Sequence, residues 1–323
     1  MIELKELLAN STVLSMPLKT PFRGLNHREV MIFESENGFS EWSPFLEYST
    51  TESARWLKAS LNWLENPRPK TQIDSITPNA TLPAVDASEV ERVLKNYRHL
   101  NTIKIKVAEP GQSRQTDLQR IQAAINFAPD ANIRLDANGG LDIEQSLELI
   151  YWLKQNSVKL QYLEQPVKTI EELSKLKSEI ESQQLDVLIA ADESIRKNTD
   201  PFEVDSEQAA DLMVVKWQPL GGIEEILEID KKVETPLVVS SALESAVGLN
   251  AGIWLACSLD SGFDPGLGTS SLFVKDIVDE LPMEAVEISP NRDTMKSLEA
   301  DSETTARWHQ RLTDCYGQLY SPE

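Results

Sequence analysis

The chain has 323 residues and a formal net charge of −21 at pH 7, because 52 Asp and Glu outnumber 31 Lys and Arg. This charge disfavours contact with nucleic-acid phosphates and anionic lipid, and no cluster of basic residues offsets it. The sequence has neither a signal-peptide pattern nor an apolar run of roughly 18 residues, so we expect a cytoplasmic monomer that binds neither nucleic acid nor membrane. Cys257 and Cys315 lie far apart and predict neither a disulfide framework nor a thiolate metal site.

Residues 1–80 have the pattern of a small α+β domain. The stretch REVMIFES is followed by Asn37-Gly38 and then by FSEWSPF, which predicts an antiparallel hairpin. Apolar residues then recur at helical spacing over residues 54–64, until Pro67 ends the pattern. We expect this domain to act as a cap on the rest of the chain.

Residues 81–291 alternate between short β-branched runs and helical patterns, such as those at 142–155 and 170–180. Eight runs are candidate strands: TLPAVDA, TIKIKV, NIRLDAN, QYLEQP, VLIAADES, DLMVVKW, PLVVSSAL and, more weakly, FDPGLGT. This alternation predicts parallel strands joined by helices, and eight units predict a (β/α)8 barrel of the TIM type. An open doubly wound sheet is the alternative, but no G-x-G-x-x-G motif follows any of the runs.

The last segment, 292–323, is polar with a helical pattern. Its apolar anchors are Trp308, Leu312 and Leu319. We expect this segment to pack back on the cap.

Three acidic residues follow three consecutive predicted strands. Asp136 ends NIRLDAN, Glu164 ends the QYLE run, and Asp192 follows VLIAA, at equal intervals along the chain. In such barrels the chemistry lies at the carboxyl ends of the strands, so the three carboxylates are expected to converge. Carboxylates that converge repel one another unless a cation holds them, and an all-oxygen site favours Mg²⁺ or Mn²⁺. A single acid at such a position is as readily a helix cap, but three in register predict a metal site.

Basic residues occupy the neighbouring strands. Lys104 and Lys106 are two positions apart and therefore share one face of their strand, which in a barrel is the inside. Lys216 ends an almost wholly apolar run, and Arg134 is expected to point inward two residues before Asp136. Surface lysines are common, but cations on strand interiors are costly unless they are paired or functional.

A Lys-x-Lys on the second strand, Asp, Glu and Asp on the next three, and Lys on the sixth resemble the enolase superfamily, in its muconate-lactonising subgroup. The resemblance implies a modified (β/α)8 TIM barrel with an N-terminal α+β capping domain, and a Lys or His base acting with Mg²⁺. It implies that Asp136, Glu164 and Asp192 bind the metal. Lys106 would be the acid–base residue, Lys104 would support it, and Lys216 would stabilise the intermediate from the opposite side.

Within the subgroup the sequence is similar to a dehydratase of menaquinone biosynthesis, which implies a small dicarboxylate substrate and a syn elimination of water. The motifs that carry this likeness are FRGLNHREV, FSEWSPFLEY, RLDANGG, YLEQP, ADES, VKWQPLGG, SSALESAVGL and PGLGTSSLF. Polar or cap positions within or beside these motifs are candidates for substrate binding: Arg134, Asn138, Ser240, Ser241, Arg23 and Gly24. Glu244, after the seventh strand, is a further candidate.

Three other functions are alternatives to this dehydratase. A mandelate-racemase-type enzyme would need a His base on late strands, but His27, His99 and His309 lie outside the strand ends. An N-acylamino-acid racemase or dipeptide epimerase of the same subgroup is the main alternative, because two lysines also suit proton transfer on two faces. Epimerases resemble one another in an Asp-x-Asp on the eighth strand, where this chain has only Asp264. A non-catalytic barrel would be expected to lose some of the strand-end acids and bases, and none is lost.

Overall fold

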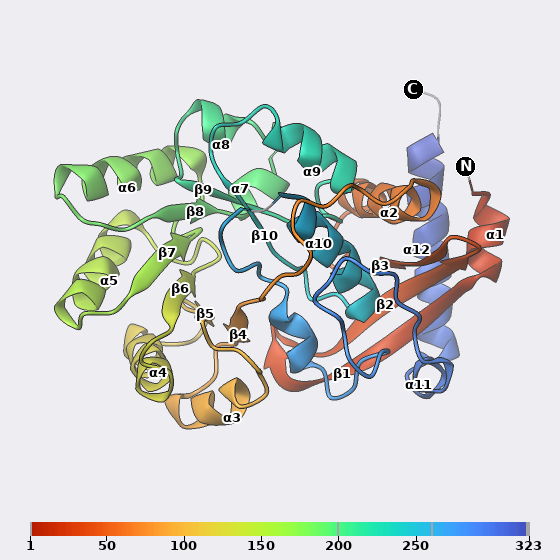
Figure 1. Ribbon diagram of the computed structural model, residues 1–323, viewed down its shortest axis with the longest axis horizontal. Helices are drawn as coiled ribbons and strands as arrows, with labels where there is room; N and C mark the ends of the chain where they lie inside the picture. Colours follow the sequence, from red (N-terminus) through yellow and green to blue (C-terminus); the bar gives the residue numbers. More distant parts are fainter. Residues whose placement is uncertain (1, 199, 260, 321–323) are drawn as a thin grey trace.

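The computed structural model describes residues 2–198, 200–259 and 261–320, which form an antiparallel cap and a parallel barrel (Figure 1). The cap sheet contains β1 (Ser11–Phe22), β2 (Leu25–Ser35) and β3 (Gly38–Trp42) in that order. Ser35 pairs with Gly38, so the hairpin predicted at Asn37-Gly38 is confirmed. Strand β1 was not predicted from the sequence. It carries Pro17 and Pro21, and as an edge strand it tolerates both.

Helix α2 (Thr50–Glu65) follows the hairpin as predicted. It begins with a capping box, in which Ser49 accepts from the Glu52 amide while Glu52 accepts from the Ser49 amide. Its buried face includes Leu57, Leu61 and Leu64, which pack into the core of the cap. The extended backbone of Asn66, just before Pro67, ends the helix.

The barrel sheet has seven parallel strands arranged in chain order, from β4 to β10. They are β4 (Ala80–Leu82), β5 (Thr102–Lys106), β6 (Asn132–Asp136), β7 (Leu160–Glu164), β8 (Ile189–Ala191), β9 (Leu212–Val215) and β10 (Leu237–Val239). Seven of the eight expected strands are therefore confirmed. Parallel order places the carboxyl ends of all seven at one mouth of the barrel.

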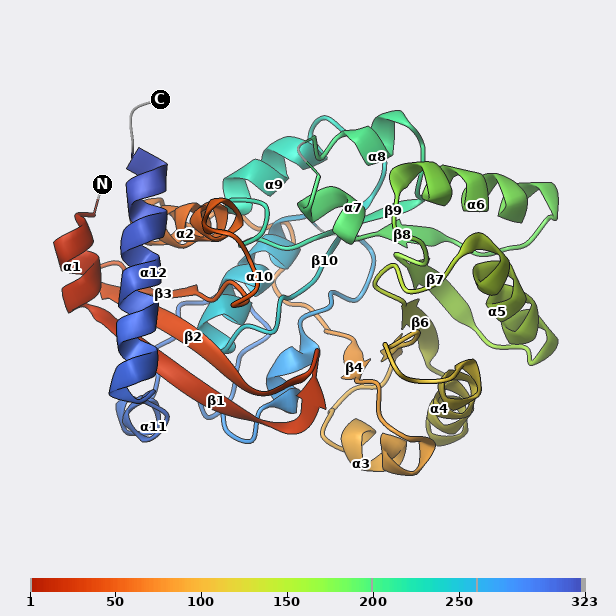
Figure 2. The same ribbon diagram turned by 180° about the vertical axis from the view of Figure 1, so that it is seen from behind.

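Helices connect the strands on the outside of the barrel (Figure 2). The longer ones are α4 (Arg114–Phe127), α5 (Ile143–Gln155), α6 (Ile170–Ser182), α9 (Ile223–Asp230) and α10 (Ala246–Leu259). The shorter ones are α3 (Val90–Leu94), α7 (Glu193–Arg196) and α8 (Glu203–Ser206). Helix α10 is buried along almost its whole length, as expected for a helix whose sequence is mostly apolar on all sides.

The expected eighth strand, FDPGLGT, is not formed as a regular strand, and this expectation was wrong. The segment makes a single parallel bridge between Ser240 and Gly266. The Gly266 amide donates to Val239 O at 2.7 Å, and Pro265 O accepts from the Asn79 amide at 2.9 Å. Two residues thus close the barrel between the end of β10 and the start of β4.

The C-terminal segment forms α11 (Arg292–Ser297) and α12 (Ser302–Tyr320), and α12 packs on the cap beside α1 (Leu4–Ala9) and α2 (Figure 2). Trp308 and Leu312 are fully buried, and the Trp308 ring meets Trp42 edge-on at 5.3 Å. Tyr316 donates from its hydroxyl to Ile2 O at 3.1 Å. In the described ranges, no helix is long and apolar enough to cross a bilayer.

The cap is attached to the barrel through one continuous apolar cluster. This cluster joins cap residues such as Phe45 with Ala242, Leu243 and Ala246, which follow β10. The loop at the mouth of the barrel is therefore packed directly against the cap.

Candidate active site

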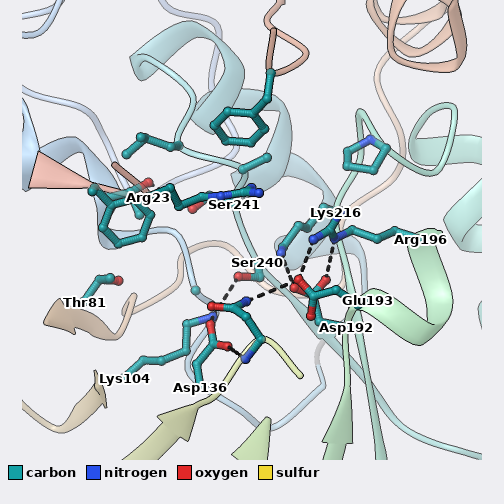
Figure 3. A pocket seen from close by; sticks show the side chains of 18 of the residues that line it. Arg23, Thr81, Lys104, Asp136, Asp192, Glu193, Arg196, Lys216, Ser240 and Ser241 are labelled. Atoms are coloured by element: carbon teal, nitrogen blue, oxygen red, sulfur yellow. Dashed lines mark hydrogen bonds and ion pairs between the residues drawn. The ribbon is translucent and has the colours of Figure 1, made fainter. Parts of the chain in front are cut away.

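A polar pocket lies between the mouth of the barrel and the cap (Figure 3). Barrel residues supply its charged floor, and cap residues supply an aromatic wall. The lining residues are Phe22, Arg23, Phe45, Tyr48, Trp56, Thr81, Lys104, Lys106, Asp136, Asn138, Asp192, Glu193, Arg196, Lys216, Pro219, Ser240, Ser241, Ala242, Leu243, Gly266 and Thr269.

The three strand-end carboxylates are all buried at the mouth. Asp136 and Glu164 end β6 and β7 and are paired directly in register, and Asp192 follows β8. Their residues are at most 2 % exposed. Asp136 and Asp192 line the pocket, whereas Glu164 lies behind the Lys104 ammonium and does not line it.

Each carboxylate is paired with a lysine. Lys104 Nζ lies 3.1 Å from both Glu164 carboxylate oxygens and 3.7 Å from Asp136 Oδ2. Lys106 Nζ lies 2.6 Å from Asp136 Oδ2. Lys216 Nζ lies 2.6 Å from Asp192 Oδ2. Because β5 and β9 are separated by three strands, Lys106 and Lys216 approach the pocket from opposite sides.

The crowding of charges shifts the pKa values of the acids in different directions. Burial raises the pKa of Glu164 to about 7, and repulsion by Asp136 adds to the effect. Burial also acts to raise the pKa of Asp192, but Lys216 and Arg196 outweigh it, so the net shift is downward. Glu164 is thus the acid whose charge is least compensated by the protein.

The donor set suits a hard divalent cation. Within residues 2–198, 200–259 and 261–320, no three Asp, Glu, His or Cys side chains converge closely enough to hold a metal, and Lys104 contacts both Glu164 and Asp136. The chemistry nevertheless fits, because three buried carboxylates supply only the oxygen ligands that a hard divalent cation prefers. Binding would require the lysine ammonium groups to move aside.

Asn138, Ser240 and Ser241 all reach the pocket. Asn138 accepts from Lys106 Nζ at 2.6 Å and adopts a positive φ of 46° in the turn after β6. Ser240 Oγ accepts from Lys104 Nζ at 3.4 Å. The Ser241 hydroxyl lies 2.9 Å from that of Thr269. The polar positions after β6 and β10 therefore lie beside the lysines.

Arg23 reaches the pocket from the turn between β1 and β2, where its guanidinium lies over the Phe45 ring at 4.1 Å. Gly24 occupies the next position of that turn with φ +74° and is not among the lining residues.

Arg134 differs from expectation, because its buried guanidinium lies below the pocket. It donates to Gln161 Oε1 at 2.6 Å, Asn79 Oδ1 at 2.9 Å and Asp264 O at 2.6 Å. Its position gives no support to the expected contact with substrate. Glu244 is also buried outside the pocket lining.

Arg196 and the aromatic wall were not predicted from the sequence. Arg196 Nε lies 3.2 Å from Asp192 Oδ1, and its NH1 donates to the Tyr48 hydroxyl at 3.0 Å. The spacing of four residues between Asp192 and Arg196 on a short helix was a usable signal. Tyr48, Phe45 and Trp56 come from the cap, and their proximity to the barrel could not be inferred from local pattern.

Comparisons with known proteins agree with this architecture. The enolase N-terminal domain-like family matches residues 13–63, and the enolase C-terminal domain-like family matches residues 86–281. The chain is 37% identical over 323 residues to the o-succinylbenzoate synthase of Mycobacterium ulcerans (strain Agy99), covering 98% of this chain and 96% of that protein. It is 38% identical over 322 residues to the o-succinylbenzoate synthase of Mycolicibacterium smegmatis, covering 98% of each.

Two solved structures share the fold at lower identity. The L-Ala-D/L-Glu epimerase from Bacillus subtilis superposes with a TM-score of 0.69 at 20% identity, covering 83% of this chain and 90% of that chain. The muconate lactonizing enzyme from Pseudomonas putida gives a TM-score of 0.67 at 16% identity, covering 90% and 98%.

Proposed function

The chain belongs to the o-succinylbenzoate synthase family of the enolase superfamily, and from this premise we propose the role of each residue in its pocket. The reaction is that of a metal-dependent hydro-lyase in menaquinone biosynthesis. It removes water from 2-succinyl-6-hydroxy-2,4-cyclohexadiene-1-carboxylate and yields 2-succinylbenzoate. The substrate is a dicarboxylate, so the site must hold two anionic groups and remove a weakly acidic proton next to one of them.

Lys106 is the acid–base residue of this proposal. In the first half-reaction Nζ takes the proton from the carbon that bears the ring carboxylate, and the electrons of the C–H bond move into that carboxylate as an enediolate. In the second half-reaction the bond to the ring hydroxyl breaks, and Nζ returns the proton to the departing oxygen as water. A syn elimination needs only one such group, and Lys106 lines the pocket beside Asp136.

Lys216 and Lys104 stabilise the negative charge that develops on the substrate. Lys216 lies on the opposite side of the pocket, where its ammonium can face the ring without exchanging a proton. Burial acts to lower the pKa of Lys104, but the attraction of Glu164 and Asp136 outweighs it, so the pKa lies above its ordinary value. This pairing favours the cationic form of Lys104, and fixed charges in a site shielded from water stabilise an anionic transition state strongly.

Asp136, Glu164 and Asp192 would hold Mg²⁺ or Mn²⁺ in this proposal. When bound, the divalent cation supplies positive charge that acidifies the proton next to the substrate carboxylate. The burial of all three carboxylates at the mouth of the barrel supports this assignment, because buried charges need a partner of opposite sign.

The succinyl arm of the substrate is proposed to lie toward the cap. Ser240, Ser241 and Thr269 offer hydroxyl groups on the barrel side, and Arg23 offers a cation on the cap side. Asn138 is assigned to the Lys106 side, where it already accepts from Nζ.

A racemase or epimerase is the alternative, and the opposed lysines are the observation that favours it. Against it, the Asp264 carboxylate does not line the pocket and accepts instead from Thr102 Oγ1 at 2.6 Å. The closing segment therefore offers no acid to bind a substrate amine. This absence is what favours dehydration of a dicarboxylate over epimerisation of an amino-acid derivative.

The pairing of Lys106 with Asp136 carries the proposal, and a direct assay tests it. Purified protein is incubated with 2-succinyl-6-hydroxy-2,4-cyclohexadiene-1-carboxylate and Mg²⁺, and formation of 2-succinylbenzoate is followed. We expect turnover by the native chain and by Glu144→Gln, a surface control on α5, and almost none by Lys106→Ala. Turnover by Lys106→Ala at the native rate would contradict the assignment.

A further inference from the structure

Three charged side chains are buried at the junction of cap and barrel, outside the catalytic group. Arg28 on β2 is 2 % exposed, Glu41 on β3 is 0 % exposed, and Glu244, after β10, is 1 % exposed. Buried charges are costly unless they are paired and hydrogen-bonded. Burying these three side chains therefore costs free energy of folding. Their contacts indicate which parts of the structure they hold in place.

Arg28 connects the cap to the loop that forms one wall of the pocket. Its Nε donates to Leu243 O at 3.1 Å, and its NH2 donates to Ala242 O at 3.5 Å and to Ser43 O. Ala242 and Leu243 both line the pocket, whereas Arg28 itself does not. Arg28 thus acts on the pocket only through the backbone that it binds.

Arg28 also supports the aromatic wall of the pocket. Its guanidinium lies 4.2 Å from the centre of the Phe45 ring, and that ring lines the pocket. Arg23 approaches the same ring to 4.1 Å. One buried residue therefore contacts both the cap side and the barrel side of the pocket wall.

Glu244 also holds the loop at Ala242, and Glu41 holds its other end at the start of α10. Glu41 Oε2 accepts from the Ser245 amide at 2.9 Å and from the Gly248 amide at 3.2 Å, at the start of α10. Glu244 Oε2 accepts from the Ala242 amide at 2.6 Å. These two hydrogen bonds join a cap residue to the first turn of α10, so Glu41 fixes the position of a barrel helix.

The space for both glutamates depends on Gly248. A Cβ at this position would lie 2.6 Å from Glu244 Cβ and 3.0 Å from Glu41 Cδ. The packing of the two acids against α10 is therefore specific, since any larger residue would displace them.

The loop between these anchors is strained. Leu243 has φ +62°, a conformation that branched and bulky side chains rarely adopt. Such backbone persists only where its surroundings hold it, and it is common at functional sites. Here Arg28 binds the carbonyl of Leu243, and Glu244 binds the amide of Ala242.

We propose that Arg28 is a positioning residue for the dehydration, which holds the Ala242–Leu243 loop and the Phe45 ring in the shape that fits the succinyl arm of the substrate. This inference rests on the proposed function of the pocket. Because the lysines and carboxylates lie on other strands, loss of Arg28 weakens binding of the substrate more than it slows the chemistry.

The test compares Arg28→Gln and Arg28→Lys with a matched control, Arg68→Gln. Arg68 is another largely buried arginine at the edge of the cap; it lies 3.6 Å from the centre of the Trp63 ring, binds Glu287 Oε1 at 2.6 Å and does not line the pocket. Steady-state kinetics give KM and kcat separately, calorimetric titration gives the Kd of 2-succinylbenzoate, and thermal denaturation gives the Tm. Lysine keeps the charge but loses the planar fork that binds several carbonyls.

We expect Arg28→Gln to raise KM and the product Kd about tenfold or more, with a much smaller change in kcat. Arg28→Lys is expected to recover part of this loss, and Arg68→Gln to lower Tm without changing KM. Unchanged KM and Kd in both Arg28 variants, or failure of both to fold, would overturn the proposal by reducing Arg28 to a structural role. The proposed function is tested by turnover of the native protein, which none of these outcomes affects. A failure of the proposal for Arg28 is therefore distinct from a failure of the proposed function.

Discussion

Lys106 Nζ and Asp136 Oδ2 lie 2.6 Å apart, on residues that are paired directly in register on the neighbouring strands β5 and β6. The same distance separates Lys216 Nζ and Asp192 Oδ2 near the other side of the pocket. Each side of the pocket thus holds a lysine against a proposed metal ligand. The arrangement balances the charges of the lysines and the carboxylates within the pocket.

Replacing Lys106 by alanine should remove almost all turnover while leaving the fold intact. Positioned acid–base catalysis contributes about 10²–10⁴-fold, and one residue serves both half-reactions here, so the loss should lie at the upper end. Lys104→Ala should be less damaging, because it removes charge but not the transferred proton. Steady-state rates with circular dichroism as a folding check decide this, and a larger loss in Lys104→Ala would mean that the base is wrongly assigned.

Replacing Glu164 by glutamine should weaken Mg²⁺ binding severely. The change removes one anionic ligand from a site of three carboxylates and leaves the shape of the side chain almost unchanged. Calorimetric titration of Mg²⁺ into the native chain, Glu164→Gln and the surface control Glu144→Gln measures the effect. Equal affinity in all three would rule out Glu164 as a ligand.

Gly266→Ala should destabilise the closure of the barrel, because a Cβ there would lie 2.4 Å from Ser240 Oγ. Overpacking of this kind costs about 1–3 kcal/mol in the free energy of unfolding. Gly317→Ala on α12 is the control, since its Cβ would meet nothing within 4 Å. Denaturant unfolding of both variants gives the comparison, and a Gly266→Ala protein as stable as the control would show that this contact is readily relieved.

The stability of the protein should fall as the pH rises from about 5 to about 8. Burial and repulsion by Glu244 raise the pKa of Glu41 to about 8, and burial raises that of Asp276 to about 6. A carboxyl with a raised pKa binds a proton in the folded state that the unfolded state has already released. For Glu41, the contribution to the free energy of unfolding is therefore complete below the ordinary pKa of 4.5. It is lost as the pH rises past about 8.

The Tm measured across this pH range provides the check. Glu41→Gln should flatten the decline above pH 6, whereas Glu36→Gln, on the exposed turn of the cap hairpin, should follow the native curve. A decline of equal slope in Glu41→Gln would assign the titration to other groups.

Local patterns in the sequence predicted the parts of the fold that depend on neighbouring residues. The Asn37-Gly38 hairpin and seven barrel strands follow from turn chemistry and from alternating runs. The prediction of an eighth strand was wrong because FDPGLGT carries Pro265. Three backbone groups of Pro265 and Gly266 suffice to close the barrel there. Strand β1 was missed because its prolines obscure a strand that only its place at the sheet edge permits.

The residues of the site also divide into those that local patterns predict and those that depend on tertiary packing. Alternation along β6 indicates that Arg134 faces inward, but it does not give the depth at which the side chain lies, and Arg134 proved to lie below the pocket. Arg28, Tyr48 and Phe45 act on the pocket from the cap, across a junction that only the tertiary packing creates. The pattern of residues along one strand contains no information about contacts between the cap and the barrel.

The comparison of two substrate classes tests most directly the claim that this pocket was built for dehydration. Racemisation and dehydration share the first proton transfer, so they differ only in how the site treats the rest of the substrate. We predict that kcat/KM for 2-succinyl-6-hydroxy-2,4-cyclohexadiene-1-carboxylate exceeds that for N-succinylamino acids or dipeptides by at least about 10²-fold, which corresponds to roughly 2.7 kcal/mol of transition-state discrimination. Equal values, or a higher value for an amino-acid derivative, would contradict the account.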